Sequence, residues 1–214
     1  MISKYEYIIW DWNGTLLNDV WLCIEIMNQM LKKRNLPGLT YDAYREMFDF
    51  PVKRYYEKAG FNFKIESFED ASVEYCDEYI NRVNECDLHK GAFSILNFFK
   101  ENSVPQTILS ATDQPGLNKM INDFALDTYF HKVIGQDTQL AIGKTEKGKQ
   151  LIEEINIDPD KIVLIGDTTH DVEVADALDI DCVLLLNGHH SKSKLEMTGV
   201  RVVKELLNLI PGNN

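Results

Sequence analysis

Two aspartates directly follow short apolar runs, and a third lies four residues after the second of them. Asp11 follows "YIIW" in "YIIWDWNGTLLND", Asp167 opens "GDTTHD" after "KIVLIG", and Asp171 comes four residues later. Ligands of open parallel sheets bind outside the carboxyl ends of the strands. Three carboxylates gathered there repel one another, and a hard divalent cation keeps them ionised together. The pattern therefore predicts a Mg²⁺ site, because Mg²⁺ takes a few carboxylates and keeps positions for water and a phosphate oxygen.

Two further residues suit a phosphoryl group at the same edge. Ser110 ends the run "VPQTILS", and Lys144 in "IGKTEKG" precedes a helix-length pattern. They supply a hydroxyl and a fixed positive charge, which are groups that stabilise phosphoryl oxygens. Together with the carboxylates they favour phosphoryl-transfer chemistry.

The elements that must position these residues follow from the hydrophobic pattern. Apolar runs rich in β-branched residues occupy residues 7–10, 104–110, 161–167 and 181–187. Such continuous runs are typical of strands buried on both faces of a parallel sheet. Helix-length patterns lie between the later runs, at residues 115–124, 145–155 and 171–178. This alternation predicts a doubly wound, Rossmann-like α/β core.

The segment between the first two strands is far longer than the crossover of a dozen or more residues that a parallel connection needs. Trp21, Ile24 and Leu31 recur in it at helical spacing, which indicates a helix core face, and "LPG" stops that helix. Three later stretches show the same mixed pattern: "TYDAYREMF", "PVKRYYEKAG" and "SFEDASVEYCDEYINRV". We expect a helical cap over residues 17–90, inserted into a core of residues 1–16 and 91–214.

Composition narrows the class of protein. The chain has 214 residues, 44% of them hydrophobic, and a net charge of −12, which argues against a nucleic-acid partner. Its N-terminus lacks the pattern of a signal peptide, and no run reaches the roughly 18 apolar residues of a membrane span. The four cysteines form no CxxC pair. We expect a soluble cytoplasmic monomer or homodimer without a membrane partner.

In their order along the chain, these residues resemble the four motifs of the haloacid dehalogenase superfamily. "DWNGTL" is similar to the first motif, Ser110 to the second, Lys144 to the third and "GDTTHD" to the fourth. The resemblance covers essentially the whole chain and points to the phosphoglycolate phosphatase branch, which has a helical cap after strand one. It implies a hydrolase that acts on small phosphorylated metabolites.

The resemblance also assigns roles to the carboxylates. It implies that Asp11 is the nucleophile and forms an aspartyl phosphate that water then hydrolyses. It further implies that Mg²⁺ is held by Asp11, the backbone carbonyl of Asn13, and Asp167, with Asp171 as a direct or indirect partner.

The same resemblance assigns the groups that bind the transferring phosphoryl group. They are Thr15, Ser110, the backbone amide of Ala111, and Lys144, which would orient and neutralise its oxygens. The interval between Ser110 and Lys144 is too short for a second cap.

Asn13 departs from the family pattern. In the family's phosphatases this position is normally a second aspartate, which protonates the leaving oxygen and then activates water. An amide cannot move that proton, and such catalysis contributes typically 10² to 10⁴ in rate. His170 in "GDTTHD" is the nearest substitute acid, although an exposed histidine at a helix start is the commoner interpretation. We therefore expect a slow phosphatase, or one restricted to good leaving groups.

Two other functions remain open. "DWNGT" is similar to the "DWAGT" of phosphonoacetaldehyde hydrolases, which use a cap lysine as a Schiff base; Lys53 is the candidate here, in charge-rich surroundings that argue against it. A silent binding module is the other alternative, and the retained Asp11, Ser110 and Lys144 argue against it.

The C-terminal part offers two structural predictions. In "NGHHSKSKLEMTG", adjacent histidines on a strand would point to opposite faces, so we interpret residues 187–199 as a mobile loop and not as a metal site. "VVKELLNLIPGNN" predicts a final amphipathic helix that ends at Pro211.

Overall fold

A six-stranded parallel sheet forms the centre of the computed structural model, which describes residues 2–137 and 143–212. Its strand order is β5-β4-β1-β6-β7-β8. The strands are β1 (Tyr7–Trp10), β4 (Gln106–Asp113), β5 (Lys132–Gln136), β6 (Ile162–Gly166), β7 (Asp181–Leu185) and β8 (Arg201–Val203). The predicted doubly wound α/β core is confirmed. Because β4 and β6 flank β1 on opposite sides, the strand order reverses at β1, where such sheets bind ligands.

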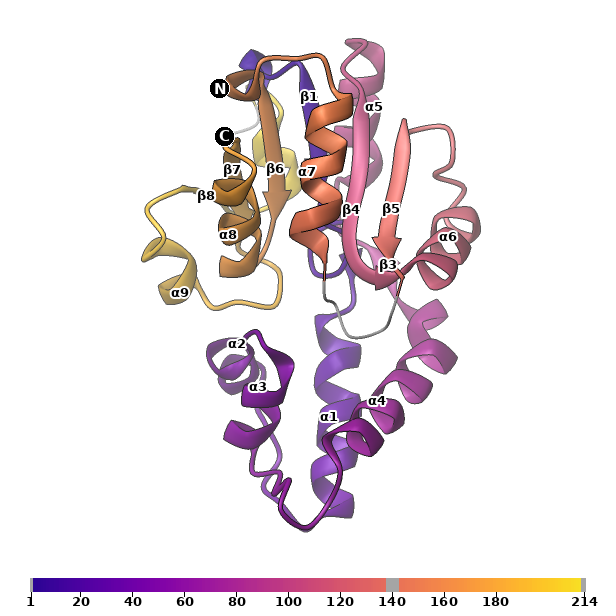
Figure 1. Cartoon of the computed structure of the whole chain (residues 1–214), viewed down its shortest axis with the longest axis vertical. Coiled ribbons are helices and arrows are strands. Elements are labelled where there is room, and N and C mark those ends of the chain that lie inside the picture. Colours follow the sequence, from indigo (N-terminus) through magenta and orange to yellow (C-terminus); the bar gives the residue numbers. More distant parts are fainter. Residues whose placement is uncertain (1, 138–142, 213–214) are drawn as a thin grey trace.

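Helices cover both faces of the sheet, as the apolar runs required. All four residues of β1 are buried, and their side chains alternate between two apolar clusters. Ile8 and Trp10 pack with α5 (Ala92–Glu101), whereas Tyr7 and Ile9 pack with α7 (Lys144–Glu154) and α8 (Thr169–Ala177). Figure 1 shows α7 and α8 in front of the sheet and α5 further back. A strand buried on both faces needs apolar residues at every position.

Two strands were missed and one was bounded wrongly. β5 and β8 are edge strands that the hydrophobic runs did not reveal. The second predicted strand was expected to end at Ser110, but β4 continues to Asp113, with an irregular register between Leu109 and Asp113. Its last three residues are only partly buried, so the hydrophobic pattern fades before the strand does.

The predicted C-terminal helix is wrong. Arg201–Val203 form β8, which pairs with Val183–Leu185 of β7, and Leu206–Leu209 form only a short 3₁₀ helix. Pairing with the edge of the sheet satisfies backbone groups that the helix would otherwise have satisfied. Leu206 and Leu209 still reach the apolar cluster that contains α5.

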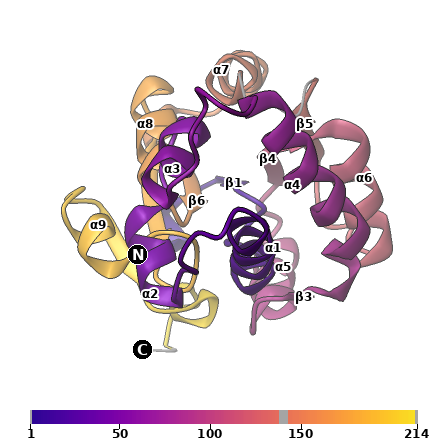
Figure 2. The ribbon, with the colours of Figure 1, turned by 90° about the horizontal axis from the view of Figure 1, so that it is seen from below.

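Four helices lie between residues 20 and 82, at the carboxyl ends of the strands (Figure 1). They are α1 (Val20–Lys33), α2 (Tyr41–Met47), α3 (Val52–Ala59) and α4 (Phe68–Arg82). Figure 2, seen from below, shows them grouped at that end of the molecule. A short antiparallel pair, β2 (Leu17–Asn18) and β3 (Asp87–Leu88), joins the two ends of this segment. The division into a cap of residues 17–90 and a core of the remaining residues stays a prediction.

Side chains within this helical segment pack as a core. Leu31 is fully buried, and Trp21 and Ile24 pack against the same cluster, so the apolar stripe of α1 is a core face. The side chains of Thr40 and Ser67 accept hydrogen bonds from the first turns of α2 and α4, which fixes where these helices begin. In the described part of the chain, no helix is both long and apolar enough to cross a bilayer.

Candidate active site

The three predicted carboxylates meet at the carboxyl end of the sheet. Asp11 follows β1 and Asp167 follows β6, and these strands pair in parallel, so both carboxylates arrive at one edge. Asp171 lies in the first turn of α8. All three side chains are buried, and each has a carboxylate oxygen within 4.8 Å of the others.

Lys144 joins two of these carboxylates. It is the first residue of α7, and its Nζ lies 2.6 Å from Oδ1 of Asp11 and 2.7 Å from Oδ1 of Asp171. The other oxygen of Asp171 accepts hydrogen bonds from the backbone amide of Thr168, at 3.0 Å, and from its hydroxyl, at 2.8 Å. Both oxygens of Asp171 are therefore engaged, one by the lysine and one by the start of its own helix.

Burial and charge set the protonation of this cluster. Burial raises the pKa of Asp11 to about 6 and that of Asp167 to about 7. Against the effect of burial, the ammonium of Lys144 lowers the pKa of Asp171, and the two carboxylates raise the pKa of Lys144. The lysine pairs with two of the three buried carboxylates, and the excess negative charge suits a divalent cation.

Thr15 and Ser110 line the same edge. The hydroxyl of Thr15 donates to Oδ1 of Asp167 at 2.8 Å and lies 3.5 Å from Oδ2 of Asp11. Ser110 is buried on β4, two residues beyond Ile108, which pairs with Trp10. Its hydroxyl oxygen accepts the backbone N–H of Thr112 at 3.1 Å.

Asn13 is held by three hydrogen bonds. Its Oδ1 accepts the hydroxyl of Thr112 at 2.6 Å, and its Nδ2 donates to Oδ2 of Asp19 at 2.8 Å and to the hydroxyl of Tyr79 at 2.7 Å. A side-chain amide has two N–H donors, and both are used here. This amide therefore has no spare donor for a leaving oxygen in the structure.

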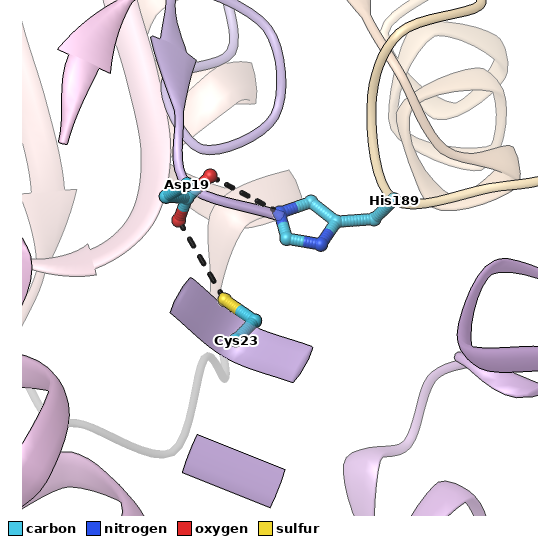
Figure 3. A group of neighbouring side chains, drawn as sticks. All are labelled: Asp19, Cys23 and His189. Atoms are coloured by element: carbon cyan, nitrogen blue, oxygen red, sulfur yellow. Dashed lines mark hydrogen bonds and ion pairs between the residues drawn. The ribbon is translucent and has the colours of Figure 1, made fainter. Parts of the chain in front are cut away.

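Asp19 and His189 belong to the site, and sequence reasoning missed both. Asp19 is fully buried and His189 is 5% exposed; Oδ1 of Asp19 lies 3.4 Å from Nε2 of His189 (Figure 3). The backbone amide of His189 donates to Oδ2 of Asp167 at 2.6 Å, and Nδ1 lies 2.8 Å from the hydroxyl of Tyr44. Against the effect of burial, His189 lowers the pKa of Asp19 to about 2, and Asp19 raises that of His189 to about 9.

The interpretation of residues 187–199 as a mobile loop is wrong for much of that segment. Lys192–Glu196 form helix α9, and His189 and His190 are both buried. Gly188 lets the backbone after β7 pass close to Asp167, because a Cβ at this position would clash with the Asp167 side chain. The useful signal was that "NGHH" follows β7 at the edge where Asp11 and Asp167 end their strands.

Cys23 completes a possible donor set with Asp19 and His189, since its Sγ lies 3.8 Å from Oδ2 of Asp19 (Figure 3). The oxygens of Asp19 already face four other groups: the backbone amide of Gly14, the amide of Asn13, the hydroxyl of Tyr79 and the imidazole of His189. A carboxylate offers about four lone-pair positions. The cluster therefore fits a saturated ion pair and not an open metal site.

The two remaining candidates make their contacts elsewhere. His170 lies 3.0 Å from Glu173, and its ring packs 4.8 Å from that of Phe50. Lys53 is exposed, and its Nζ lies 5.8 Å from the centres of the Phe63 and Phe68 rings. An exposed lysine lacks the apolar pocket that would make it a Schiff-base nucleophile.

Comparison with known proteins gives matches along most of the chain. A family model described as haloacid dehalogenase-like hydrolase matches residues 8–185. The phosphoglycolate phosphatase of Pseudomonas fluorescens is 24% identical over 96% of this chain and 78% of its own length. Tyrosine-protein kinase PtkA of Mycobacterium tuberculosis is 23% identical over 92% of this chain and 68% of its own length. A structure described as a haloacid dehalogenase-like hydrolase from Bacteroides fragilis has a TM-score of 0.81 and 17% identity, covering 96% of this chain and 100% of that one.

Proposed function

The chain belongs to the haloacid dehalogenase-like hydrolases, and on that basis we propose that it is a magnesium-dependent phosphatase of small phosphorylated metabolites. One observation carries the proposal: the buried carboxylate of Asp11 ends the strand where the sheet order reverses, 2.6 Å from the ammonium of Lys144. That is a nucleophile beside a fixed cation at the place where this fold binds ligands.

Asp11 is the proposed nucleophile. Lys144 occupies its Oδ1, which leaves Oδ2 to attack phosphorus and form an aspartyl phosphate as the bond from phosphorus to the leaving oxygen breaks. That oxygen departs as an anion, since Asn13 cannot protonate it. Water then attacks that phosphorus, which releases phosphate and restores the carboxylate. Lys144 remains charged throughout, because Asp11 and Asp171 raise its pKa against the effect of burial.

Magnesium fits the excess negative charge of the cluster. Asp11, Asp167 and the backbone carbonyl of Asn13 would hold it, and Asp171 would act indirectly, since both of its oxygens are engaged. Bound there, the ion would supply positive charge to the phosphoryl oxygens. Thr15 would support this arrangement by fixing the orientation of Asp167.

The transferring group would lie between β1 and β4. The hydroxyl of Ser110, the backbone amide of Ala111 and the ammonium of Lys144 are its proposed partners, since they face the charge that spreads over the equatorial oxygens. The helices α1 to α4 would cover the substrate, and Tyr79 of α4 already contacts Asn13. A small substrate accords with the phosphoglycolate phosphatase named among the relatives.

The acid step limits the choice of substrate. Asn13 cannot move a proton, and His170 makes its contacts with Glu173 and Phe50. We therefore expect faster turnover of acyl or aryl phosphates, whose leaving groups need no proton, than of alkyl phosphates. A silent binding module would have no use for the paired Asp11 and Lys144.

The test is phosphate release from a panel of alkyl, acyl and aryl phosphates with Mg²⁺, for the native protein and Asp11→Asn. A positive result is turnover by the native protein that Asp11→Asn lacks, with a phosphorylated Asp11 trapped by acid quench. A parallel arm supplies ATP and a tyrosine-containing peptide, because one relative is named as a tyrosine kinase. Transfer to the peptide without hydrolysis would overturn the phosphatase assignment, and absence of turnover and of Mg²⁺ binding would leave the silent module.

A further inference from the structure

A side-chain hydrogen bond joins Asn13 of the first motif to Asp19, which lies three residues beyond that motif. Nδ2 of Asn13 lies 2.8 Å from Oδ2 of Asp19, and the backbone amide of Gly14 donates to Oδ1 at 2.8 Å. Asp19 is fully buried and immediately precedes α1. An aspartate there usually accepts hydrogen bonds from the first turn of its helix. This carboxylate turns instead toward the residues that follow the nucleophile.

The orientation of the Asn13 amide follows from its partners. The carboxylate of Asp19 only accepts hydrogen bonds, so the amide must present its nitrogen on that side. The oxygen then faces Thr112, whose hydroxyl donates at 2.6 Å. Tyr79 closes the group, since its hydroxyl accepts from Asn13 and donates to Asp19, both at 2.7 Å.

A carboxylate at position 13 would not fit this environment. Its oxygen would stand about where Nδ2 stands now, 2.8 Å from a second carboxylate oxygen. Two buried carboxylates at that distance cannot both stay ionised without further positive charge. The charge of His189 already pairs with the other oxygen of Asp19, Oδ1.

We propose that Asn13 and Asp19 form an exchanged amide–carboxylate pair, in which Asp19 positions the amide and makes an aspartate at position 13 unfavourable. Position 13 then lacks an acid because position 19 carries the carboxylate. For activity, the inference rests on the proposed phosphatase function; for stability, it stands on the contacts alone.

Reversing the pair preserves the hydrogen bonds. With a carboxylate at 13 and an amide at 19, the new amide oxygen accepts from Gly14 and His189, and its nitrogen donates to position 13. The hydroxyls of Thr112 and Tyr79 then donate to the new carboxylate. Each single change, in contrast, brings two carboxylates or two amides into contact.

The experiment is a double-mutant cycle of the native protein, Asn13→Asp, Asp19→Asn and the combination. Thermal unfolding is followed in EDTA, and phosphate release from glycerol 3-phosphate, an alkyl phosphate whose leaving oxygen needs a proton, is followed with Mg²⁺. We expect Asn13→Asp to lower Tm by more than about 5 °C, as a buried uncompensated charge does. We expect the combination to lose less Tm than the two single losses added together, by about 5 °C or more, and to stay below the native value because His189 no longer faces a charged partner at position 19. In activity, Asn13→Asp should be no faster than native, and the combination about 10-fold or more faster, because an acid is restored at position 13.

If the loss of Tm in the combination equals the sum of the two single losses, the proposal is overturned. An Asn13→Asp protein that is as stable and as fast as the combination would overturn it as well. The control cycle pairs Asp19→Asn with Asn28→Asp, whose effects should add, since Asn28 bonds to the backbone of Leu39. If Asn13→Asp is insoluble, soluble folding of the combination supports the pair, and insolubility of both overturns it. The thermal cycle remains decisive if none of the proteins hydrolyses phosphate, so failure of the phosphatase assignment is recognised separately.

Discussion

The imidazole of His189 lies 3.4 Å from the carboxylate of Asp19, and this buried ion pair ties the loop after β7 to the residue that begins α1. The backbone of His189 also holds Asp167, which ends β6. One histidine thus connects the proposed metal carboxylates with the start of the helical segment.

The ion pair predicts that stability depends on pH. Against the effect of burial, Asp19 raises the pKa of His189 from 6.5 to about 9, so this contribution is fully present below pH 6.5 and is lost as pH rises through 9. The shift corresponds to about 3 kcal/mol, or a fall in Tm of roughly 6 to 12 °C. Asp19 adds a second pH dependence on the acid side. Its pKa is lowered to about 2, so its contribution to stability is present above pH 3.8 and is lost as pH falls through 2.

Thermal unfolding in EDTA at pH 6 and pH 9.5 tests the histidine limb. The reference is His189→Gln, whose amide nitrogen still donates to Asp19 but carries no charge. The native protein should lose more Tm between the two pH values than the variant does. Equal losses in both proteins would show that other groups cause the dependence.

Removal of the Lys144 charge should destabilise the site strongly. Lys144→Met leaves Asp11 and Asp171 as buried, unpaired carboxylates, which costs about 3 to 5 kcal/mol, a fall in Tm of roughly 6 to 20 °C. Adding Asp171→Asn should recover part of the loss, because it removes one of the stranded charges. The matched control is Lys149→Met on the same helix, which loses a surface pair with the exposed Glu146 and should change Tm little. Equal effects at both lysines would contradict the proposed pairing.

Magnesium should stabilise the protein through Asp167. A concentration about 100 times the dissociation constant adds about 2.7 kcal/mol, or roughly 5 to 11 °C in Tm. Asp167→Asn should abolish most of that rise, whereas Asp137→Asn, at an exposed carboxylate, should preserve it. An unchanged rise in Asp167→Asn would place the bound ion elsewhere on the acidic surface.

Two tyrosines of the helical segment should respond oppositely to the loss of their hydroxyls. Tyr79→Phe removes one hydrogen-bond partner from each of Asn13 and Asp19 and should cost about 1 to 3 kcal/mol. The hydroxyl of Tyr55 is buried without a partner in the described part of the chain, so Tyr55→Phe should be neutral or stabilising. Chemical denaturation measures both free energies of unfolding. A larger loss of stability in Tyr55→Phe than in Tyr79→Phe would contradict this account of the two hydroxyl groups.

The sequence alone revealed the fold class and the three carboxylates at the site. The run "YIIW" is apolar at every position because β1 is covered on both faces, and that pattern is local. Asp11 and Asp167 directly follow such runs, so parallel pairing had to bring them to one edge. The helices α1 to α4 were equally visible, since their spacing and stop signals lie within each segment, whereas α5 was not among the predicted helices.

Other features depended on contacts between distant parts of the chain. β8 forms because the edge of β7 offers hydrogen bonds to Arg201–Val203, which no local pattern shows. The direction of the Asn13 amide depends on Asp19, Thr112 and Tyr79, and its chemistry changes with theirs. The sequence by itself determined which residue types end the central strands, because strand burial leaves a local hydrophobic pattern. Only the tertiary structure decided which groups those residues pair with, because hydrogen bonds and ion pairs depend on positions that distant segments fix together.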